Sequence, residues 1–243
     1  MDYSFLQCGE GALTVHLGDG IDPAINRRVT ALQGAIDSAG LRGITDLIPA
    51  YADLTVCYDC TVISAKALQR QLRRLLDSLS VAGQDRRRVF RLPVCYGGDY
   101  GPDLDFVCHH SGLSAQEVIA LHSAPDYLIY MLGFLPGFAY LGGLDPRLHT
   151  PRLDSPRTCI PAGSVGIGGA QTGVYPLASP GGWQLLGRTP VSVFDRQRQE
   201  PILYRAGDLV HFVPISPAEY EEIARAVAAG TYTVQVEEVS VCD

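Results

Sequence analysis

The sequence predicts an α+β protein with two domains, a small α/β sandwich over residues 1–88 and a β-rich domain over residues 89–243. The first ninety residues alternate apolar strand candidates with amphipathic helices, whereas the remainder holds many short strands and few helices. The polar segment 80–88 (SVAGQDRRR) separates the two patterns, as expected of a domain boundary. A chain of 243 residues is long enough for one large core or two modest ones.

The N-terminal elements follow from apolar spacing and capping residues. Strands are expected at 12–17, where apolar and polar residues alternate, and at 54–58. Asp22-Pro23 starts a helix that Gly40 ends, and Ser64 caps a second helix. Each helix carries one apolar face, formed by Ile25, Val29, Leu32 and Ile36 in the first and by Leu68, Leu72, Leu75, Leu76 and Leu79 in the second.

The second part of the chain is typical of a β-barrel or sandwich. Capping boxes at Ser114-x-x-Glu117 and Ser216-x-x-Glu219 open two helices, the second of which Gly230 ends. Around them the sequence predicts short strands at 89–94, 164–167, 174–175, 183–186, 191–194, 209–214 and 232–236.

Composition excludes several classes of function. A net charge of −7 argues against a nucleic-acid partner. The N-terminus lacks the pattern of a signal peptide, and no apolar run approaches a membrane span, so we expect a cytoplasmic protein without a membrane partner. The only lysine, Lys66, lies on a predicted helix surface. The seven arginines between 70 and 91 indicate either a patch for phosphate or acidic partners or, as we favour, a solvated helix face and linker.

Seven scattered cysteines are typical of reduced thiols. The single CxxC, Cys57 to Cys60, indicates a metal site, a redox pair or, as we favour, incidental strand-end residues. A zinc site needs further ligands at suitable spacing, and none is near, so we expect no metal.

Residues 130–190 are the most informative part of the sequence. Glycine and proline crowd this stretch and exclude a helix, and it contains the only tryptophan, Trp183. No P-loop, dinucleotide fingerprint, HExxH or nucleophile elbow is present in the sequence. The glycine run 163–169 indicates either a phosphate cradle or, as we favour, tight barrel corners. Ser164 and Ser179 have no evident histidine base, so we expect turn or positioning roles for both.

Polar and aromatic side chains in this stretch suit the binding of a small planar amide or acid. Arginine matches carboxylate or phosphate with two parallel hydrogen bonds, glutamine reads an amide edge, and Tyr and Trp offer an apolar wall with a polar tip. Spacing alone leaves a structural role equally open. The candidates are Arg157, Gln171, Tyr175, Trp183 and Arg188, with His149 either a substrate contact or a surface residue.

Several motifs in order resemble the allophanate hydrolase subunit 1 family, which includes the B subunit of prokaryotic 5-oxoprolinase and a bacterial histidine-kinase inhibitor. The resemblance covers nearly the whole chain. Two departures stand out: the small residues 167–170 are reordered before Gln171, and Cys159 replaces an expected polar residue. The motifs are GFLPGFAYL (133–141), PAGSV (161–165), GAQTGVYP (169–176), SPGGW (179–183), GRTP (187–190) and GDLVHFVP (207–214).

The resemblance implies a cyclophilin-like barrel as the C-terminal domain and a non-autonomous subunit of an ATP-dependent lactam hydrolase. It implies pairing with a homologous barrel subunit of the C type and with a third subunit of the A type, which together open 5-oxoproline to L-glutamate, with ATP shared or held by the partners. On this hypothesis Arg157 and Arg188 are catalytic and stabilise negative charge. The substrate-binding residues are then Tyr140, Gln171, Tyr175, Trp183 and His149.

Two alternatives remain open at this point. In the first, the barrel inhibits a sensor histidine kinase through exposed aromatic anchors, for which Phe134, Phe138 and Tyr140 are candidates unless they belong to the core. In the second, the chain is the carboxyltransferase half of a urea or allophanate pathway. That function requires biotin, and the sequence holds no biotinyl-lysine domain, so it ranks last.

Overall fold

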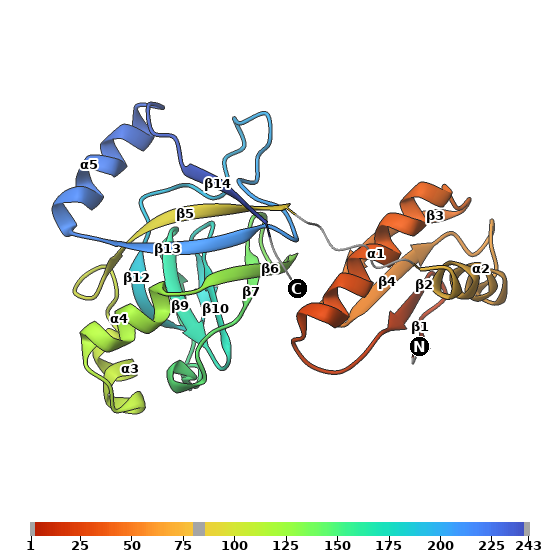
Figure 1. The fold of residues 1–243 in the computed structure, drawn as a ribbon, viewed down its shortest axis with the longest axis horizontal. Helices are drawn as coiled ribbons and strands as arrows, with labels where there is room; N and C mark the ends of the chain where they lie inside the picture. Colours follow the sequence, from red (N-terminus) through yellow and green to blue (C-terminus); the bar gives the residue numbers. More distant parts are fainter. Residues whose placement is uncertain (1–2, 80–85, 241–243) are drawn as a thin grey trace. The chain divides into compact units, whose positions relative to one another are not determined.

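The computed structural model describes residues 3–79 and 86–240, and the chain divides into two compact units at residues 84 and 85 (Figure 1). Most of the predicted boundary segment 80–88 lies outside the described residues, so the limits of the predicted domains stay a prediction. Each unit has its own buried core. No helix among the described residues is long and apolar enough to cross a membrane.

The N-terminal unit is a four-stranded antiparallel sheet covered by two helices. Its strand order is β1-β2-β4-β3, and alternate residues such as Leu13, Val15, Leu54 and Val56 are fully buried. Helices α1 and α2 pack their apolar faces into the same cluster. The elements are β1 (Ser4–Cys8), β2 (Ala12–His16), α1 (Pro23–Ala39), β3 (Ile44–Pro49), β4 (Asp53–Tyr58) and α2 (Ala65–Asp77).

Capping residues set the ends of these helices as predicted. The Asp22 carboxylate accepts a hydrogen bond from the Ala24 N–H, and Gly40 ends α1 with a φ of 56°. The Ser64 hydroxyl accepts a hydrogen bond from the Ala67 N–H at the start of α2. Leu68, Leu72 and Leu76 are buried because their four-residue spacing places them on one face.

The C-terminal unit is a seven-stranded barrel. Its strands follow the order β12-β9-β10-β7-β6-β13-β5, and pairing of β12 with β5 closes the barrel, while β14 adds to the outer edge of β5. The predicted α+β class, with a small helix-covered sheet followed by a barrel, is confirmed. The strands are β5 (Arg86–Tyr96), β6 (Asp126–Leu132), β7 (Ala139–Gly142), β9 (Ser164–Gly168), β10 (Gln171–Val174), β12 (Gln184–Arg188), β13 (Leu209–Ile215) and β14 (Gln235–Ser240), with β8 (Arg157–Ile160) and β11 (Ser179–Gly181) as a separate pair.

Three helices and one short 3-10 turn accompany the barrel in the described part of the chain. Both predicted capping boxes are present, at Ser114 and Glu117 and at Ser216 and Glu219. The sequence did not predict α3, a helix of eight residues whose N-cap, Asp103, makes no side-chain cap. The elements are α3 (Leu104–Ser111), α4 (Ala115–Ser123), η1 (Pro146–Leu148) and α5 (Pro217–Ala228).

A buried hydrogen-bond chain crosses the barrel core at His122, which is fully buried. The Thr172 hydroxyl donates to the Gly166 carbonyl at 3.0 Å, so it accepts from His122 Nε2 at 2.7 Å. Nδ1 is then the acceptor for the Tyr96 hydroxyl at 2.8 Å. Burial lowers the pKa of His122 to about 3, so the ring is neutral and its tautomer is fixed by its partners.

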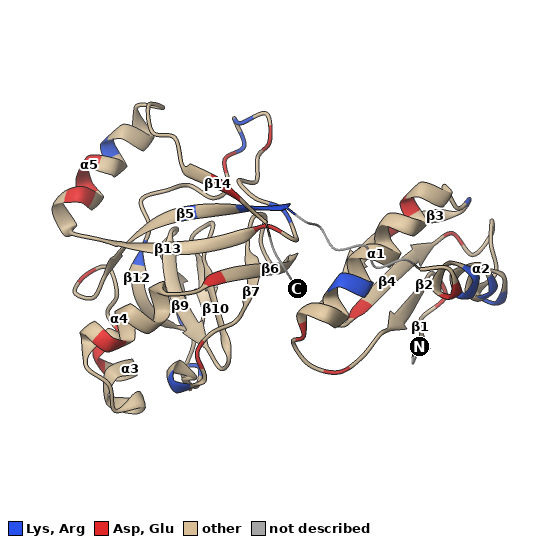
Figure 2. Cartoon of the chain, viewed as in Figure 1, with Lys and Arg blue, Asp and Glu red and all other residues tan. Residues whose placement is uncertain are grey.

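Three expectations were wrong in detail. Residues 191–194 form no strand, and only an isolated bridge joins Phe194 to Ile202. The final strand is 235–240 rather than 232–236. Arg86 to Arg88 begin β5, where cross-strand carboxylates offset part of their charge (Figure 2): Arg88 pairs with Asp208 at 2.6 Å. They are therefore strand residues and not part of a helix face or linker.

Candidate functional site

Residues 130–190 build a small pocket on the outer side of the barrel. Trp183 fills the space left by glycines on neighbouring strands: a Cβ on Gly173 would lie 3.2 Å from Trp183 Cζ3, and one on Gly168 would overlap the indole ring. A Cβ on Gly181 would likewise lie 2.6 Å from the Tyr175 hydroxyl. The glycines therefore act here as spacers that let aromatic rings approach the backbone. The pocket has a volume of about 160 Å³ and is lined by Phe134, Phe138, Tyr140, Arg152, Tyr175, Gly181, Gly182 and Trp183.

Phe138 is the centre of the aromatic cluster. Its ring is buried and meets four other rings edge-to-face, at centroid distances between 5.2 and 5.5 Å. Edge-to-face pairs of this kind stabilise a cluster by about 0.5–1.5 kcal/mol each beyond area burial. The partners of Phe138 are Phe134, Tyr140, Tyr175 and Trp183. The pocket wall is therefore rigid aromatic surface.

Tyr175 supplies the polar tip of this wall. Burial raises the pKa of its hydroxyl, while a hydrogen bond from the Trp183 backbone N–H and the charges of Arg152 and Arg157 oppose the rise. The net direction is upward, so Tyr175 is a neutral phenol at physiological pH. It can donate or accept one hydrogen bond at the pocket, but it is not available there as a phenolate base.

Phe134 forms the exposed lip of the pocket in a strained turn. Its φ is 68°, and among the described residues no other non-glycine residue has a positive φ. The Leu135 N–H donates to the Gly133 carbonyl at 2.8 Å, which closes a three-residue turn around Phe134. A γ-turn with a positive central φ is rare and strained. The residue is 64% exposed and its ring touches Phe138, so the strained turn holds an aromatic ring at the pocket mouth.

Arg157, predicted to be catalytic, already has a carboxylate partner. Its Nη2 donates to Asp103 Oδ1 at 2.6 Å, and its Nη1 donates to the Trp183 carbonyl at 3.4 Å. The other oxygen of Asp103 accepts from the Leu185 N–H at 2.7 Å, which explains why Asp103 does not cap α3. The pair joins the start of α3 to β8 and β12 and contacts the backbone of Trp183, which lines the pocket.

Arg188 lies outside the pocket, but the turn 161–164 contacts both Arg188 and the pocket residue Tyr175. Its Nε donates to the Ala162 carbonyl at 2.9 Å, and among the described residues it has no ion pair. The next residue, Gly163, donates to the Tyr175 carbonyl at 2.7 Å. The turn 161–164 therefore fixes Arg188 on one side and Tyr175 on the other. The positive charge of Arg188 also acts on the Tyr220 hydroxyl of α5, and burial of that phenol remains the larger effect and raises its pKa.

The remaining predicted residues divide between the pocket and its surroundings. The structure brings Tyr140, Tyr175 and Trp183 together as pocket lining. Gln171 is half-buried at the start of β10, two residues from Gly173 and on the same strand face, but it does not line the pocket. His149 is exposed after η1, also outside the pocket. The two arginines expected to act together have different partners, and neither lines the pocket.

Arg152 and the placement of Phe134 were missed by sequence reasoning. Arg152 is exposed, lines the pocket, and its charge reaches the Tyr175 hydroxyl. It occupies a loop between η1 and β8 and belongs to no motif, so the sequence carries no signal for it. Phe134 lies in the motif that begins at Gly133, and that glycine-rich turn is the feature from which its unusual backbone follows.

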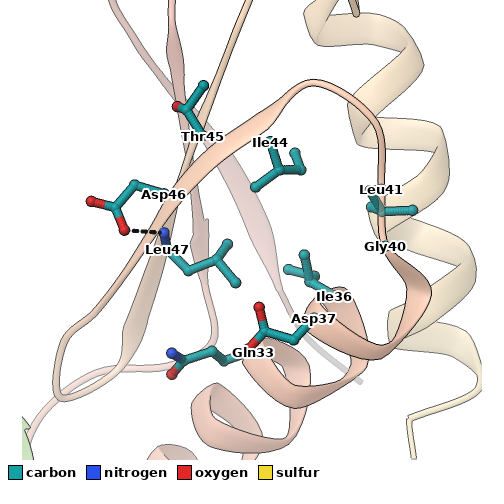
Figure 3. Close-up of a pocket in the computed structure, with 9 residues that line it drawn as sticks. All are labelled: Gln33, Ile36, Asp37, Gly40, Leu41, Ile44, Thr45, Asp46 and Leu47. Atoms are coloured by element: carbon teal, nitrogen blue, oxygen red, sulfur yellow. Dashed lines mark hydrogen bonds between the residues drawn. The ribbon is translucent and has the colours of Figure 1, made fainter.

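A second depression belongs to the N-terminal unit, between the end of α1 and β3 (Figure 3). It is open and holds about 390 Å³, and within it the Asp46 carboxylate accepts from the Leu47 N–H at 2.8 Å. Its lining combines polar side chains such as Gln33 and Asp37 with aliphatic ones such as Leu41 and Leu47. Within residues 3–79 and 86–240 no group of three His, Cys, Asp or Glu side chains is placed to hold a metal, and Cys57 and Cys60 are free thiols.

Comparison with known proteins gives a consistent result. Residues 3–204 match the family described as carboxyltransferase domain, subdomain C and D. The chain is 42% identical to the B subunit of 5-oxoprolinase from Bacillus subtilis, over 90% of this chain and 95% of that protein. It is 46% identical to the B subunit of 5-oxoprolinase from Escherichia coli O157:H7, over 85% of this chain and 93% of that protein.

Solved structures show the same fold. A crystal structure of TTHA0988 is 41% identical with a TM-score of 0.74, and the match covers 84% of this chain but only 40% of that longer one. The urea carboxylase of Kluyveromyces lactis is 23% identical with a TM-score of 0.82, covering 97% of this chain and 24% of that one. At that identity the second likeness supports the fold alone.

Proposed function

The chain belongs to the carboxyltransferase domain, subdomain C and D family and groups there with the B subunits of 5-oxoprolinases, and from this membership we propose that it is the B subunit of an ATP-dependent 5-oxoprolinase. The observation that carries the proposal is identity of 42–46% to proteins of that name over nearly their whole length. The names of these relatives make the chain one subunit of a hydrolase complex. We further propose that this complex converts 5-oxoproline to L-glutamate.

The pocket supports a binding role in that reaction. Its rigid aromatic wall, formed by Tyr140, Tyr175 and Trp183, suits one face of a small ring, and the Tyr175 hydroxyl can meet an amide edge. We propose this wall as the part of the substrate site that the chain contributes. Gln171 and His149 lie outside it and are, on this proposal, peripheral.

The two arginines receive different roles. We propose Arg188 as the charge-stabilising residue, because among the described residues no carboxylate neutralises it. Arg157 is better described as a positioning residue, since its guanidinium is bound to Asp103 and to the backbone of Trp183. On this proposal its hydrogen bond to the Trp183 carbonyl helps to hold Trp183 in the pocket wall.

We place the nucleotide on a partner chain. The glycine run 163–169 is largely strand β9 and the turn into β10, so it does not form a loop at a helix N-terminus where phosphate would bind. The homologous barrel subunit and the third subunit are accordingly the proposed sites of ATP. When bound, ATP supplies the energy to open a stable lactam.

Reconstitution tests the proposal. The chain is co-expressed with a homologous barrel subunit and a third, A-type subunit, and ATP-dependent release of glutamate from 5-oxoproline is measured. Arg188→Ala should abolish turnover while the variant still co-purifies with its partners, because the substitution removes a half-exposed charge without emptying a core. Absence of turnover in the wild-type complex contradicts the function, and full activity of Arg188→Ala shows that Arg188 is structural.

The alternative of kinase inhibition receives less support from the geometry. Of its three candidate anchors, Phe138 is 3% exposed and Tyr140 is half-buried in the pocket wall. Phe134 alone is prominently exposed. A single ring is not the cluster of anchors on which that hypothesis depended.

A further inference from the structure

We infer that the pocket recognises a small cyclic amide that bears a carboxylate, with Arg152 pairing with the carboxylate and Phe134 covering the ring. The inference rests on the proposed function, since 5-oxoproline is such a compound, and it adds two specificity-determining residues outside the set expected from sequence. Phe134 was expected only as an anchor for a protein partner.

Arg152 is the cation that remains available at the pocket. The two arginines nearest to it in sequence already have carboxylate partners: Arg147 pairs with Asp145 at 2.7 Å, and Arg157 pairs with Asp103 at 2.6 Å. Among the described residues Arg152 makes no hydrogen bond or ion pair, although it lines the pocket. A guanidinium offers two parallel hydrogen bonds to a carboxylate, which fixes the orientation of the ligand as well as its charge.

The dimensions of the pocket favour a single small ring. Its volume of about 160 Å³ is below the roughly 300–1,000 Å³ of sites for drug-sized ligands. Trp183, Tyr175 and Tyr140 form the wall, and Arg152 lies at the same opening. A ligand with one polar end and a flat apolar body fits this arrangement, with its carboxylate toward Arg152 and its amide within reach of the Tyr175 hydroxyl.

Phe134 completes the enclosure at the mouth of the pocket. Phe134 is 64% exposed, so packing within the chain does not explain why a bulky residue occupies a backbone conformation that favours glycine. Strain that the fold maintains without local benefit is characteristic of ligand clamps and active sites. A ligand ring beneath Phe134 would bury the exposed face and account for the residue.

The test uses the assembled enzyme and measures KM and kcat for 5-oxoproline. Arg152→Ala should raise KM at least about tenfold with kcat changed little, because a charge-assisted hydrogen bond is lost from the bound state. The KM of Arg152→Lys should lie between those of wild type and Arg152→Ala, since lysine keeps the charge but cannot make two parallel hydrogen bonds to a carboxylate. Arg196→Ala, an exposed arginine outside the pocket, is the matched control and should leave KM unchanged. Phe134→Ala should raise KM several-fold.

A second readout separates carboxylate recognition from general damage. 2-Pyrrolidinone, the same ring without a carboxylate, is used as a competitor, and its inhibition constant should be equal in wild type and Arg152→Ala. An unchanged KM for 5-oxoproline in Arg152→Ala overturns the inference while leaving the proposed function intact. An equal loss of affinity for both compounds also overturns it, because Arg152 would then shape the pocket rather than recognise the carboxylate. A wild-type complex without turnover contradicts the proposed function itself and this inference with it.

Discussion

Replacing Phe134 by glycine should give a more stable protein than replacing it by alanine, the reverse of the usual order. At ordinary positions a protein with glycine is less stable than one with alanine by about 0.5–1 kcal/mol, because glycine gives the unfolded chain more conformational freedom. Phe134, however, has a φ of 68°, where an L-residue costs about 1–2 kcal/mol. Both variants lose the same ring contact with Phe138, so their difference isolates the backbone. We therefore expect Phe134→Gly to exceed Phe134→Ala by about 0.5–1 kcal/mol in free energy of unfolding.

Trp183 makes the measurement specific to the unit that contains Phe134. It is the only tryptophan in the chain and lies in the same pocket, so its fluorescence during chemical or thermal denaturation reports on the barrel unit. For a unit of this size the expected difference in free energy corresponds to a shift in Tm of about 1–4 °C. Gly169→Ala serves as a reference for backbone strain, because Gly169 has a φ of 66° and a Cβ there would meet nothing within 4 Å. The loss in free energy of unfolding that it causes should equal the difference in free energy of unfolding between the two Phe134 variants.

The outcome would refute the strain argument if Phe134→Ala proved as stable as Phe134→Gly or more so. The functional arm runs in the opposite direction: both variants should raise KM for 5-oxoproline, although one of them relieves strain. A residue that costs stability and improves binding is the pattern expected where strain serves a site. Relief of strain without any change in KM would instead show a turn of no consequence for binding.

Two further predictions concern buried groups. Arg157→Ala should lower the free energy of unfolding by about 2–3 kcal/mol, because it removes the ionic partner of the Asp103 carboxylate, which is only 12% exposed in the intact pair. Turnover per folded molecule should change little. Denaturation and activity assays check both, and lost turnover at unchanged stability would make Arg157 catalytic. His122 has a folded pKa of about 3 against an unfolded value near 6.5, so the unfolded state binds a proton first and stability falls as pH drops from about 6.5 toward 3. The fall contributed by His122 approaches about 1.4 kcal/mol per pH unit, and the unfolding free energy of His122→Gln should depend less steeply on pH over that window.

Local signals in the sequence predicted local structure. Asp22, Ser64, Ser114 and Ser216 each cap a helix because the capping interaction lies within three residues. The same reasoning missed α3, whose N-cap Asp103 is bound instead to a side chain 54 residues away in sequence. When a residue at an N-cap position is engaged in a long-range ion pair, the local sequence carries no capping pattern that would predict the helix.

Which side chains meet at the pocket depends on strand register, and register could not be predicted from the sequence. The pairing of Gln184 with Ile167 and of Thr172 with Leu141 decides which residues share the outer face of the barrel, and a shift by one residue would turn each to the other face. The aromatic half of the predicted constellation came together because glycines at fixed places admit Trp183. The arginines did not come together, since Asp103 and the Ala162 carbonyl hold them in different places. Arg152 took their place at the pocket without any motif to indicate it.

The chemistry of the pocket lining suits binding better than proton transfer. The described lining residues offer aromatic surface, glycine and one guanidinium. Burial raises the pKa of the Tyr175 hydroxyl, so this phenol stays neutral. Opening a lactam requires a group that activates the carbonyl and one that delivers water, and neither aromatic rings nor a guanidinium can act as a general base near pH 7. If the proposed function holds, substitutions in the lining should act mainly on KM, because they alter a binding surface. Apart from Arg188, which lies outside the lining, substitutions that act on kcat alone should then be found on a partner subunit.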